Sequence, residues 1–483
     1  MILVLVAGLL DLVRSGSRNG GVRTSGGGAA AHAGAAARPN VILIVTDDQR
    51  WDSVWSMPNV RHDLQDHGVT FTNAFVTTSF CCPSRASILT GQYSHHTGVY
   101  SDRGPNGGAP AFRDTSTVAT WLQGAGYRTA LVGKYLNEYN LMAHHIPPGW
   151  SQWDALANAD PALHYYDYTM NQNGRLVHYG SRPRDYADTV LGSIALRFVQ
   201  TARPPFFLEF APIAPHLPAP PAPGDRGRFA GTALPMRPNY NEADVGDKPW
   251  SGMFRPLLPA DAVTLRTYWD TALASLQDVD RSIGSMVAAL RADGQLRNTV
   301  FLFTSDNGML LGEHRLGERK IWPYEESIRV PLVVAGAGIS DPGRRSPDLA
   351  LNIDIAPTIA QLAGVRPGLP QDGRSLVPLL RNEHPPWRRA FVVEYLGAGN
   401  HGDGFVAPFD GIRTTRYLYV RYGPLRMVPG EPRVPYPNGT RELYDLARDP
   451  YELQNIAADP AEAALRARLG AELQRLLRRP AGA

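Results

Sequence analysis

The sequence places its only two cysteines side by side, at Cys81 and Cys82. Adjacent cysteines cannot bridge each other without severe strain, and no third cysteine offers another partner. Two thiols are also too few for a structural zinc site, which takes about four ligands at loop spacings. The pair is therefore either two small buried apolar side chains or part of a reactive site. The residues that follow decide between these.

Charged, amide and imidazole side chains follow four predicted strands at the point where each strand ends. The strands are Val41–Val45, Thr129–Val132, Phe206–Phe210 and Thr299–Phe303, and the residues beyond them are Asp47 with Asp48, Lys134, His216, and Asp306 with Asn307. Ligands of open α/β sheets sit just beyond the carboxyl ends of the strands. An aspartate pair after one strand is more often a helix cap, but coincidence at four strand ends predicts an active site.

The oxygen atoms in this set predict a hard divalent cation, because carboxylate and amide oxygens select calcium or magnesium over softer metals. The expected ligands are Asp47, Asp48, Asp306 and Asn307. The three carboxylates are balanced by three basic side chains, Arg85, Lys134 and Lys320. A divalent cation would then leave a positively charged pocket, which stabilises developing negative charge.

Cys81 opens the run Cys81-Cys82-Pro83-Ser84-Arg85-Ala86-Ser87-Ile88-Leu89-Thr90-Gly91. This run resembles C-x-P-S-R-x-x-x-L-T-G, the signature of the type I sulfatases. In that family a formylglycine-generating enzyme oxidises the first cysteine to Cα-formylglycine (3-oxoalanine), whose hydrated aldehyde is the nucleophile. The resemblance implies this modification at Cys81, with Arg85 holding the nucleophile. It also implies calcium as the metal, with an oxygen of residue 81 as a further ligand, although the residues themselves allow magnesium.

The residue types also suggest roles around the nucleophile. A helix beginning at Cys81 would turn its first backbone donors toward an anion. Lys134, His216 and Lys320 are expected to bind the sulfate, and His216 or Lys320 to protonate the leaving oxygen. Three further residues are candidates. The resemblance implies His95 as a hydrogen-bonding partner near the nucleophile, because it matches a histidine that follows the signature in relatives, and we add His314 as a substrate contact and Glu394 as a ligand of sugar hydroxyls.

The resemblance extends from Arg38-Pro39-Asn40 to about Asn455-Ile456. It is closest to N-acetylglucosamine-6-sulfatases and heparan 6-O-endosulfatases, on the stretches Gly133–Tyr139, Tyr165–Thr169 and Asn173-Gly174. This subgroup implies hydrolysis of the 6-O-sulfate of N-acetylglucosamine in glycosaminoglycan-type or other sulfated glycans. A broad arylsulfatase, or a phosphonate or phosphate ester hydrolase of the same superfamily, is the alternative.

The sequence departs from the commoner family pattern just after the predicted strand Thr129–Val132. Many sulfatases carry Lys-x-His there, whereas Lys134 is followed by Tyr135 and Leu136. The base that regenerates the aldehyde is thus unassigned, with Asn137 as a polar stand-in.

The arrangement of apolar runs predicts an α/β fold. Helix-like segments at Asp185–Gln200 and Asp261–Ala292 alternate with buried strands, as in a parallel sheet with crossovers. The resemblance implies an alkaline-phosphatase-like large, mostly parallel sheet flanked by helices. Beyond about Arg381, strands at Phe391–Tyr395 and Ile412–Tyr422 and a helix at Pro460–Leu477 predict a smaller antiparallel sheet with a helix. We therefore expect a catalytic domain over 38–380 and a C-terminal subdomain over 381–483.

Composition narrows the class of protein further. The net charge is only +3 and gives no argument for nucleic acid as a partner. No apolar run reaches the roughly 18–20 residues of a membrane span. Residues 1–37 form an apolar and then Gly/Ala/Ser-rich leader, interrupted by Asp11, in which Ala35-Ala36-Ala37 resembles a cleavage region. We expect either an export signal, with secretion or a cell-envelope location, or a disordered leader on a cytoplasmic enzyme.

Overall fold

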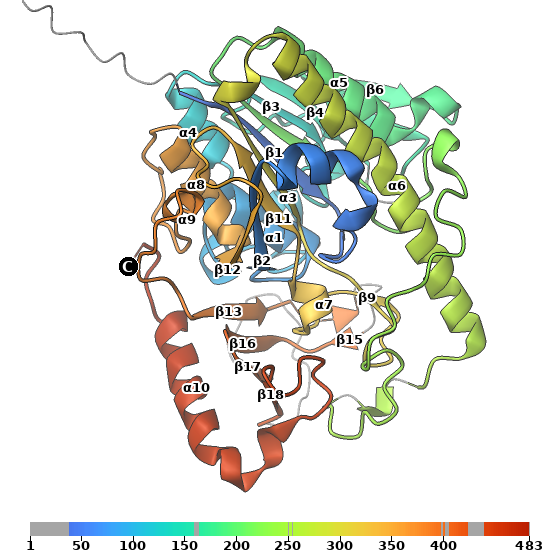
Figure 1. Cartoon of the computed structure of the whole chain (residues 1–483), viewed down its shortest axis with the longest axis vertical. Helices are drawn as coiled ribbons and strands as arrows, with labels where there is room; N and C mark the ends of the chain where they lie inside the picture. The colour runs from blue at the N-terminus through green and yellow to red at the C-terminus, as the bar shows by residue number, and fades with distance from the viewer. Residues whose placement is uncertain are drawn as a thin grey trace, which may run out of the picture. The chain divides into compact units, whose positions relative to one another are not determined.

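The computed structural model in Figure 1 describes residues 38–158, 164–249, 251–253, 255–397, 399–400, 405–423 and 439–482. The expected leader and its candidate export signal lie outside these residues. Residues 38–483 cluster as one compact unit, and the domain boundary near residue 380 stays a prediction. Within the described residues, no helix combines the length and the apolar character needed to cross a bilayer.

A ten-stranded mixed sheet forms the centre of this unit, in the order β12-β2-β11-β8-β1-β7-β3-β4-β5-β6. The strands are β12 (Arg344–Leu351), β2 (Gly68–Phe75), β11 (Leu332–Gly336), β8 (Thr299–Ser305), β1 (Asn40–Thr46), β7 (Phe206–Ala211), β3 (Arg128–Gly133), β4 (Gln152–Leu156), β5 (Tyr168–Gln172) and β6 (Arg175–Tyr179). The five central strands, from β8 to β4, are parallel. Antiparallel pairings flank them on both sides. The predicted α/β fold is confirmed, with the parallel part at its centre.

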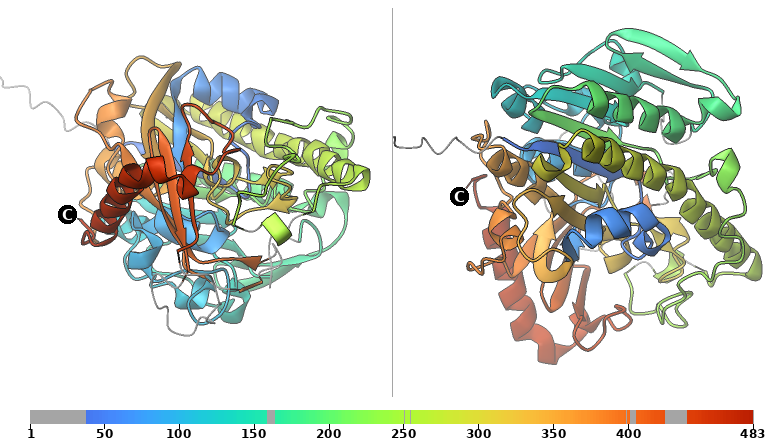
Figure 2. Two further views of the ribbon diagram at one scale, coloured as in Figure 1. Left: turned by 90° about the horizontal axis from the view of Figure 1, so that it is seen from below. Right: turned by 45° about the horizontal axis from the view of Figure 1, so that its top comes forward.

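Helices cover both faces of the sheet, and the alternation along β1 shows which helices cover which face. Val41, Leu43 and Val45 share a core with α1 (Cys81–Thr90), α4 (Val118–Gly124) and α8 (Ile355–Leu362). Ile42 and Ile44 point to the other core, with α5 (Ala187–Thr201) and the long α6 (Pro259–Ala292). Because both faces are buried, β1 is apolar at nearly every position. Figure 2 shows α5 and α6 lying along one side of the sheet.

A second sheet of four antiparallel strands follows in the chain, in the order β13-β16-β17-β18. Its strands are β13 (Ala390–Tyr395), β16 (Phe409–Thr414), β17 (Tyr417–Tyr422) and β18 (Arg441–Asp445). Helix α10 (Ala463–Leu477) lies beside this sheet in Figure 1, and its Leu469 and Leu473 pack against one face of the sheet. The other face joins the main core through Phe391 and Tyr395. The predicted small antiparallel sheet with a helix is confirmed.

Short elements complete the connections. They are α2 (Ser94–Thr97), α3 (Gly108–Ala111), α7 (Glu325–Ile328), α9 (Val377–Leu380), β9 (Leu310–Leu311), β10 (Glu318–Arg319), β14 (Gly399–Asn400) and β15 (Phe405–Val406). The turns η1 (Val54–Ser56) and η2 (Val60–Gln65) follow β1. Several of these short elements carry site residues, described next.

Candidate active site

Cys81 is the first residue of helix α1, as the sequence predicted, and it follows the extended residue Phe80. Every residue of α1 is buried, so the helix start lies inside the protein and not on its surface. The backbone N–H of Cys82 donates to Asp102 Oδ1 at 2.7 Å. A carboxylate of the chain thus occupies the donor of Cys82, and the expectation that the helix start faces a bound anion stays a prediction.

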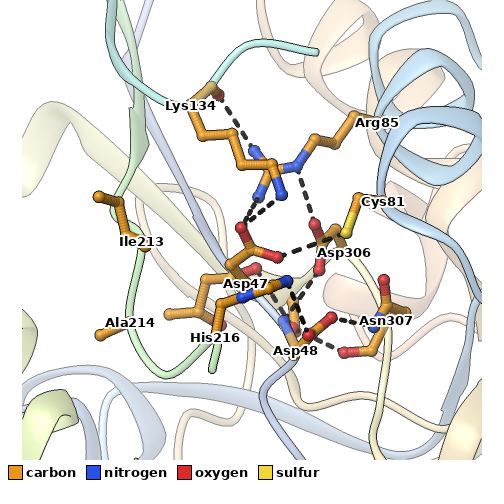
Figure 3. Close-up of polar contacts among 12 residues, drawn as sticks. Asp47, Asp48, Cys81, Arg85, Lys134, Ile213, Ala214, His216, Asp306 and Asn307 are labelled. Carbon is orange, nitrogen blue, oxygen red and sulfur yellow. Dashed lines mark hydrogen bonds and ion pairs between the residues drawn. The ribbon is translucent and has the colours of Figure 1, made fainter. Parts of the chain in front are cut away.

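Two side chains approach the Cys81 sulfur, and Figure 3 shows one of them, Asp47. Lys320 Nζ lies 2.9 Å from Sγ, and Asp47 Oδ1 lies 3.5 Å from it. Burial raises the pKa of the Cys81 thiol well above its usual value, and the charges of Lys134 and Lys320 offset only part of this rise. The unmodified thiol is therefore a neutral group in a charged surrounding.

Asp47 follows β1 and is held by two cations. Lys134 Nζ lies 2.6 Å from Asp47 Oδ2, and Arg85 Nη2 lies 3.8 Å from the same oxygen. Complete burial opposes ionisation of Asp47, but the charge of Lys134, followed by those of His216 and Arg85, lowers its pKa. Asp47 is thus an ionised buried carboxylate, paired as such groups must be.

Arg85 ties three strand ends together from one turn into α1. Its Nε donates to Asp306 Oδ2 at 2.8 Å, and its Nη1 donates to the carbonyl of Lys134 at 3.1 Å. Its third interaction is the one with Asp47 described above. The guanidinium therefore fixes the ends of β1, β3 and β8 relative to the helix that carries Cys81.

Asp48 is the second acidic residue beyond β1. Its Oδ1 accepts from Lys320 Nζ at 2.8 Å and from Asn307 Nδ2 at 2.5 Å, and its N–H donates to Asp306 Oδ1 at 3.1 Å. The pKa of Asp48 is lowered, because Lys320 and His216 outweigh the opposing effect of burial. Asp48 also has a positive φ of 65°, and so does Ile321 (78°), which follows Lys320. Such backbone strain in a branched residue is uncommon and clusters at functional sites.

The atoms left over around Asp48 fit a divalent cation. Asp48 Oδ2 and Asn307 Oδ1 are both buried and accept no hydrogen bond within the described part of the chain. Ligand atoms of Asp47, Asp48, Cys81 and His216 all lie within 4.8 Å of one another. Buried oxygens without donors are costly unless an ion or water meets them, so this donor set suits calcium or magnesium.

His216, which was predicted to contact the substrate, lies beside the predicted metal ligands. Its Nε2 is 3.4 Å from Asp48 Oδ2, and its Nδ1 lies 2.7 Å from the carbonyl of Leu217. That bond makes Nδ1 the donor and leaves the lone pair of Nε2 facing the site in the neutral imidazole. Tyr165 donates its hydroxyl to the carbonyl of His216 at 2.7 Å and so anchors this loop.

His95, in α2, is bound by a residue of the four-stranded sheet, Glu394 in β13. Its Nδ1 lies 2.8 and 2.9 Å from the two carboxylate oxygens of Glu394, and its backbone N–H donates to Glu394 at 3.1 Å. Glu394 is fully buried in β13, where it binds His95, and its contact with sugar hydroxyls stays a prediction. Its position inside the apolar run Phe391–Tyr395 is a signal for a buried, paired acid that sequence reasoning could have used.

His314 belongs to a different cluster. Its Nδ1 lies 2.6 Å from Glu242 Oε2, and its ring packs 4.2 Å from that of Tyr324, centroid to centroid. Ligand atoms of His314, Glu326 and Glu452 form a second buried group. The structure thus brings together Cys81, Arg85, Lys134, His216, Lys320 and the four predicted oxygen ligands, whereas the side-chain contacts of His314 lie elsewhere.

Two family models match the chain. The sulfatase model matches residues 39–365, and the C-terminal model of N-sulphoglucosamine sulphohydrolase matches residues 312–479. The chain is 36% identical to human N-acetylglucosamine-6-sulfatase over 393 residues, which are 76% of this chain and 69% of the relative. It is 35% identical to the Drosophila melanogaster extracellular sulfatase SULF-1 homolog over 376 residues, 74% of this chain. The chain spans only 33% of that relative and 52% of a similar one from Caenorhabditis elegans.

Solved structures are similar over nearly the same range. A protein in complex with its substrate D-glucosamine-2-N,6-O-disulfate superposes with a TM-score of 0.74 at 25% identity, over 91% of this chain and 97% of that one. The phosphonate monoester hydrolase of Agrobacterium radiobacter shares the fold, with a TM-score of 0.70 at 23% identity over 91% and 95% of the two chains. The sulfatase model covers more than half of the sequence and includes the buried run that begins at Cys81, and on this evidence the chain belongs to the sulfatase family.

Proposed function

We propose that the chain hydrolyses sulfate monoesters and that its substrate is the 6-O-sulfate of N-acetylglucosamine in a sulfated glycan. The observation that carries this proposal is the position of Cys81, at the start of a buried helix and between Lys320 and Asp47. The identity to human N-acetylglucosamine-6-sulfatase supports the choice of sugar and sulfate position.

The proposal includes conversion of Cys81 to formylglycine by a formylglycine-generating enzyme, and calcium as the metal. The Cys81 sulfur then stands near the place that the hydroxyls of the hydrated aldehyde would take. The residues that would hold the metal are Asp47, Asp48, Asp306, Asn307 and residue 81, and Nε2 of His216 lies beside them. When present, the metal polarises the sulfuryl oxygens, and the aldehyde hydrate supplies the attacking hydroxyl.

The remaining roles belong to the cations around residue 81. Lys320 would hold a proton at Nζ, between residue 81 and Asp48, and is one candidate for protonating the leaving sugar oxygen. His216 is the other candidate in its doubly protonated form, in which Nε2, 3.4 Å from Asp48 Oδ2, also carries a proton. Lys134 helps to keep Asp47 ionised, Arg85 orients the Asp306 carboxylate, and both cations add positive charge that attracts the sulfate.

We further propose that the protein acts outside the cytoplasm. The Drosophila and Caenorhabditis relatives are named extracellular sulfatases, and sulfated glycans are extracellular polymers. Fractionation of the native host, followed by immunoblotting of the culture medium, envelope and cytoplasm, tests this location. Recovery of the protein in the cytoplasm alone would contradict it.

Release of sulfate from defined sugars tests the substrate. We expect turnover of N-acetylglucosamine-6-sulfate and little turnover of its 3-sulfate isomer or of a 2-sulfated uronate. Release only from the latter two would reject the proposed sugar while leaving a sulfatase. Because phosphonate hydrolases share this fold, aryl sulfate should be compared with aryl phosphate and phosphonate esters. Preference for phosphorus esters by orders of magnitude would reject the proposed reaction.

A further inference from the structure

A surface groove lies beside the outer part of the large sheet, and its lining does not include Asp47 or Lys320, which approach Cys81. It has a volume of about 520 Å³ and is bounded by η1 and η2, by β2, and by the start of β11. Trp51 is one of the residues that line it and comes only three residues after Asp48. Since consecutive Cα atoms are 3.8 Å apart, the two Cα atoms lie within about 11 Å of each other.

The groove is positively charged. Arg61, Arg329 and Arg345 line it, together with one acid, Asp52. Asp52 is already paired, since it accepts from Arg50 at 2.9 Å and from Arg237 at 2.7 Å. Within the part of the chain that the structure describes, no ion pair engages the exposed guanidiniums of Arg61 and Arg345. The groove therefore presents positive charge without a matching acid.

Arg329 is held in place at the base of the groove. Its guanidinium lies 4.1 Å from the ring centroid of Trp51 and donates to the carbonyl of Thr72. Its nearest acid, Glu325, is 3.8 Å away and is bound more closely, at 2.7 Å, by Arg413. Burial and the charge of Arg413 outweigh that acid and lower the pKa of Arg329. A fixed, incompletely neutralised guanidinium is suited to bidentate recognition of an oxyanion.

Trp55 adds an aromatic surface to the same groove. It is 49% exposed, although large aromatic side chains usually bury more of their area, and it meets Phe229 edge-on at 5.9 Å between centroids. An exposed tryptophan in a groove that arginines also line combines an apolar face with anion recognition. Sugars that carry sulfate or carboxylate groups offer both partners on one residue.

We propose that this groove binds an anionic saccharide, namely a sulfated or carboxylated sugar residue of a glycan chain. This second proposal rests on the proposed function only for the choice of a sugar as the ligand. Single-stranded nucleic acid also uses arginine and aromatic side chains. The small net charge of +3, and Trp55 as the one exposed tryptophan among the described residues, favour a short saccharide.

The test compares two double variants that remove the same charge. Arg61→Ala/Arg345→Ala changes the groove, and Arg175→Ala/Arg184→Ala changes exposed arginines on and near β6. Calorimetric titration with a heparan-type hexasaccharide should show at least about tenfold weaker binding for the first variant than for the second. Trp55→Ala should weaken binding in the same direction. Hydrolysis of a small aryl sulfate should be unchanged in all three variants.

Equal hexasaccharide affinities of the two double variants would overturn the groove as an anionic-sugar site. Binding of a DNA oligonucleotide through the same two arginines, tighter than binding of the hexasaccharide, would overturn the choice of ligand. A wild-type protein that binds the hexasaccharide through the groove but hydrolyses no sulfate ester would reject the proposed function and support the groove. The two proposals therefore fail separately.

Discussion

The ammonium of Lys320 lies 2.9 Å from the sulfur of Cys81, although the two residues are 239 positions apart in the chain. The same Nζ is 2.8 Å from Asp48 Oδ1, so one cation links the helix start to the acidic residues beyond β1. Lys320 follows the short strand β10, and the strained residue Ile321 comes directly after it. The segment after β10 that contains Lys320 thus contributes a cation to the site from outside both β1 and α1.

Replacement of Lys320 is expected to impair the chemical step more than substrate binding. Lys320→Met removes the proton and the charge beside residue 81, so kcat for an aryl sulfate should fall by about 10²–10³-fold. Arg319→Met is the matched control, since the neighbouring side chain changes length and charge in the same way. Mass spectrometry must show the same state of residue 81 in both variants. Full activity of Lys320→Met would remove Lys320 from the proposed mechanism.

Residue 81 itself should be modified when the protein is produced together with a formylglycine-generating enzyme. The peptide that contains Cys81 is expected to lose about 18 Da relative to the unmodified thiol. Cys81→Ala should reduce sulfate release by at least about 10³-fold, because it removes the nucleophile. Cys82→Ala, at the neighbouring buried thiol, should keep both the mass loss and the activity. A wholly unmodified peptide together with active enzyme would contradict the assignment.

The site residues at strand ends could be predicted because the strands that carry them are buried on both faces. Val41–Val45 and Thr299–Phe303 are continuous apolar runs, so their ends, and the acids beyond them, are visible in the sequence. The parallel order of the central strands then brings Asp47 and Asp306 to one edge. Cys81, in contrast, was identified from a signature and not from any strand pattern.

Other parts of the fold and site were not readable because they depend on long-range pairing. Strand β2 mixes Thr70 and Thr72 with apolar residues, and its antiparallel partner β11 lies more than 250 residues away. The bond between His95 and Glu394 joins positions 299 residues apart. Similarly, the Glu242 carboxylate that binds His314 lies in an irregular segment, where no periodicity indicates a neighbour.

Asn307 provides a test of the metal site. Its Oδ1 is buried without a hydrogen bond among the described residues, so Asn307→Ala should remove a metal ligand, together with the hydrogen bond that Nδ2 donates to Asp48 Oδ1. Calcium at 100 times its Kd should stabilise the wild type by about 2.7 kcal/mol, and a Kd raised about 100-fold would abolish most of this gain. Thermal unfolding of the wild type and of Asn307→Ala, each with calcium and with a chelator, measures this stabilisation. Asn298→Ala, whose side chain only donates to the Arg38 carbonyl, is the control. An undiminished calcium effect in Asn307→Ala would exclude Asn307 as a ligand.

The raised pKa of Glu209 predicts how the free energy of unfolding depends on pH. It lies on β7, is almost completely buried, and its Oε2 has no hydrogen-bond partner among the described residues. Burial raises its pKa from 4.5 to about 7, against a smaller opposing effect of Arg85. Between these values the unfolded chain has lost the proton that the folded protein keeps, so this group makes stability fall as pH rises from about 4.5 to about 7.

Glu209→Gln should remove this contribution, because the amide keeps the size of the protonated acid and cannot ionise. Relative to the wild type, the variant should gain on the order of 3 kcal/mol of unfolding free energy between pH 4 and pH 8, since one pKa unit corresponds to about 1.36 kcal/mol. Urea denaturation at the two pH values measures the difference. Glu383→Gln, at an exposed glutamate, should show no such gain. If the two variants respond to pH alike, Glu209 is ionised in the folded protein, and its charge must be compensated by Arg85.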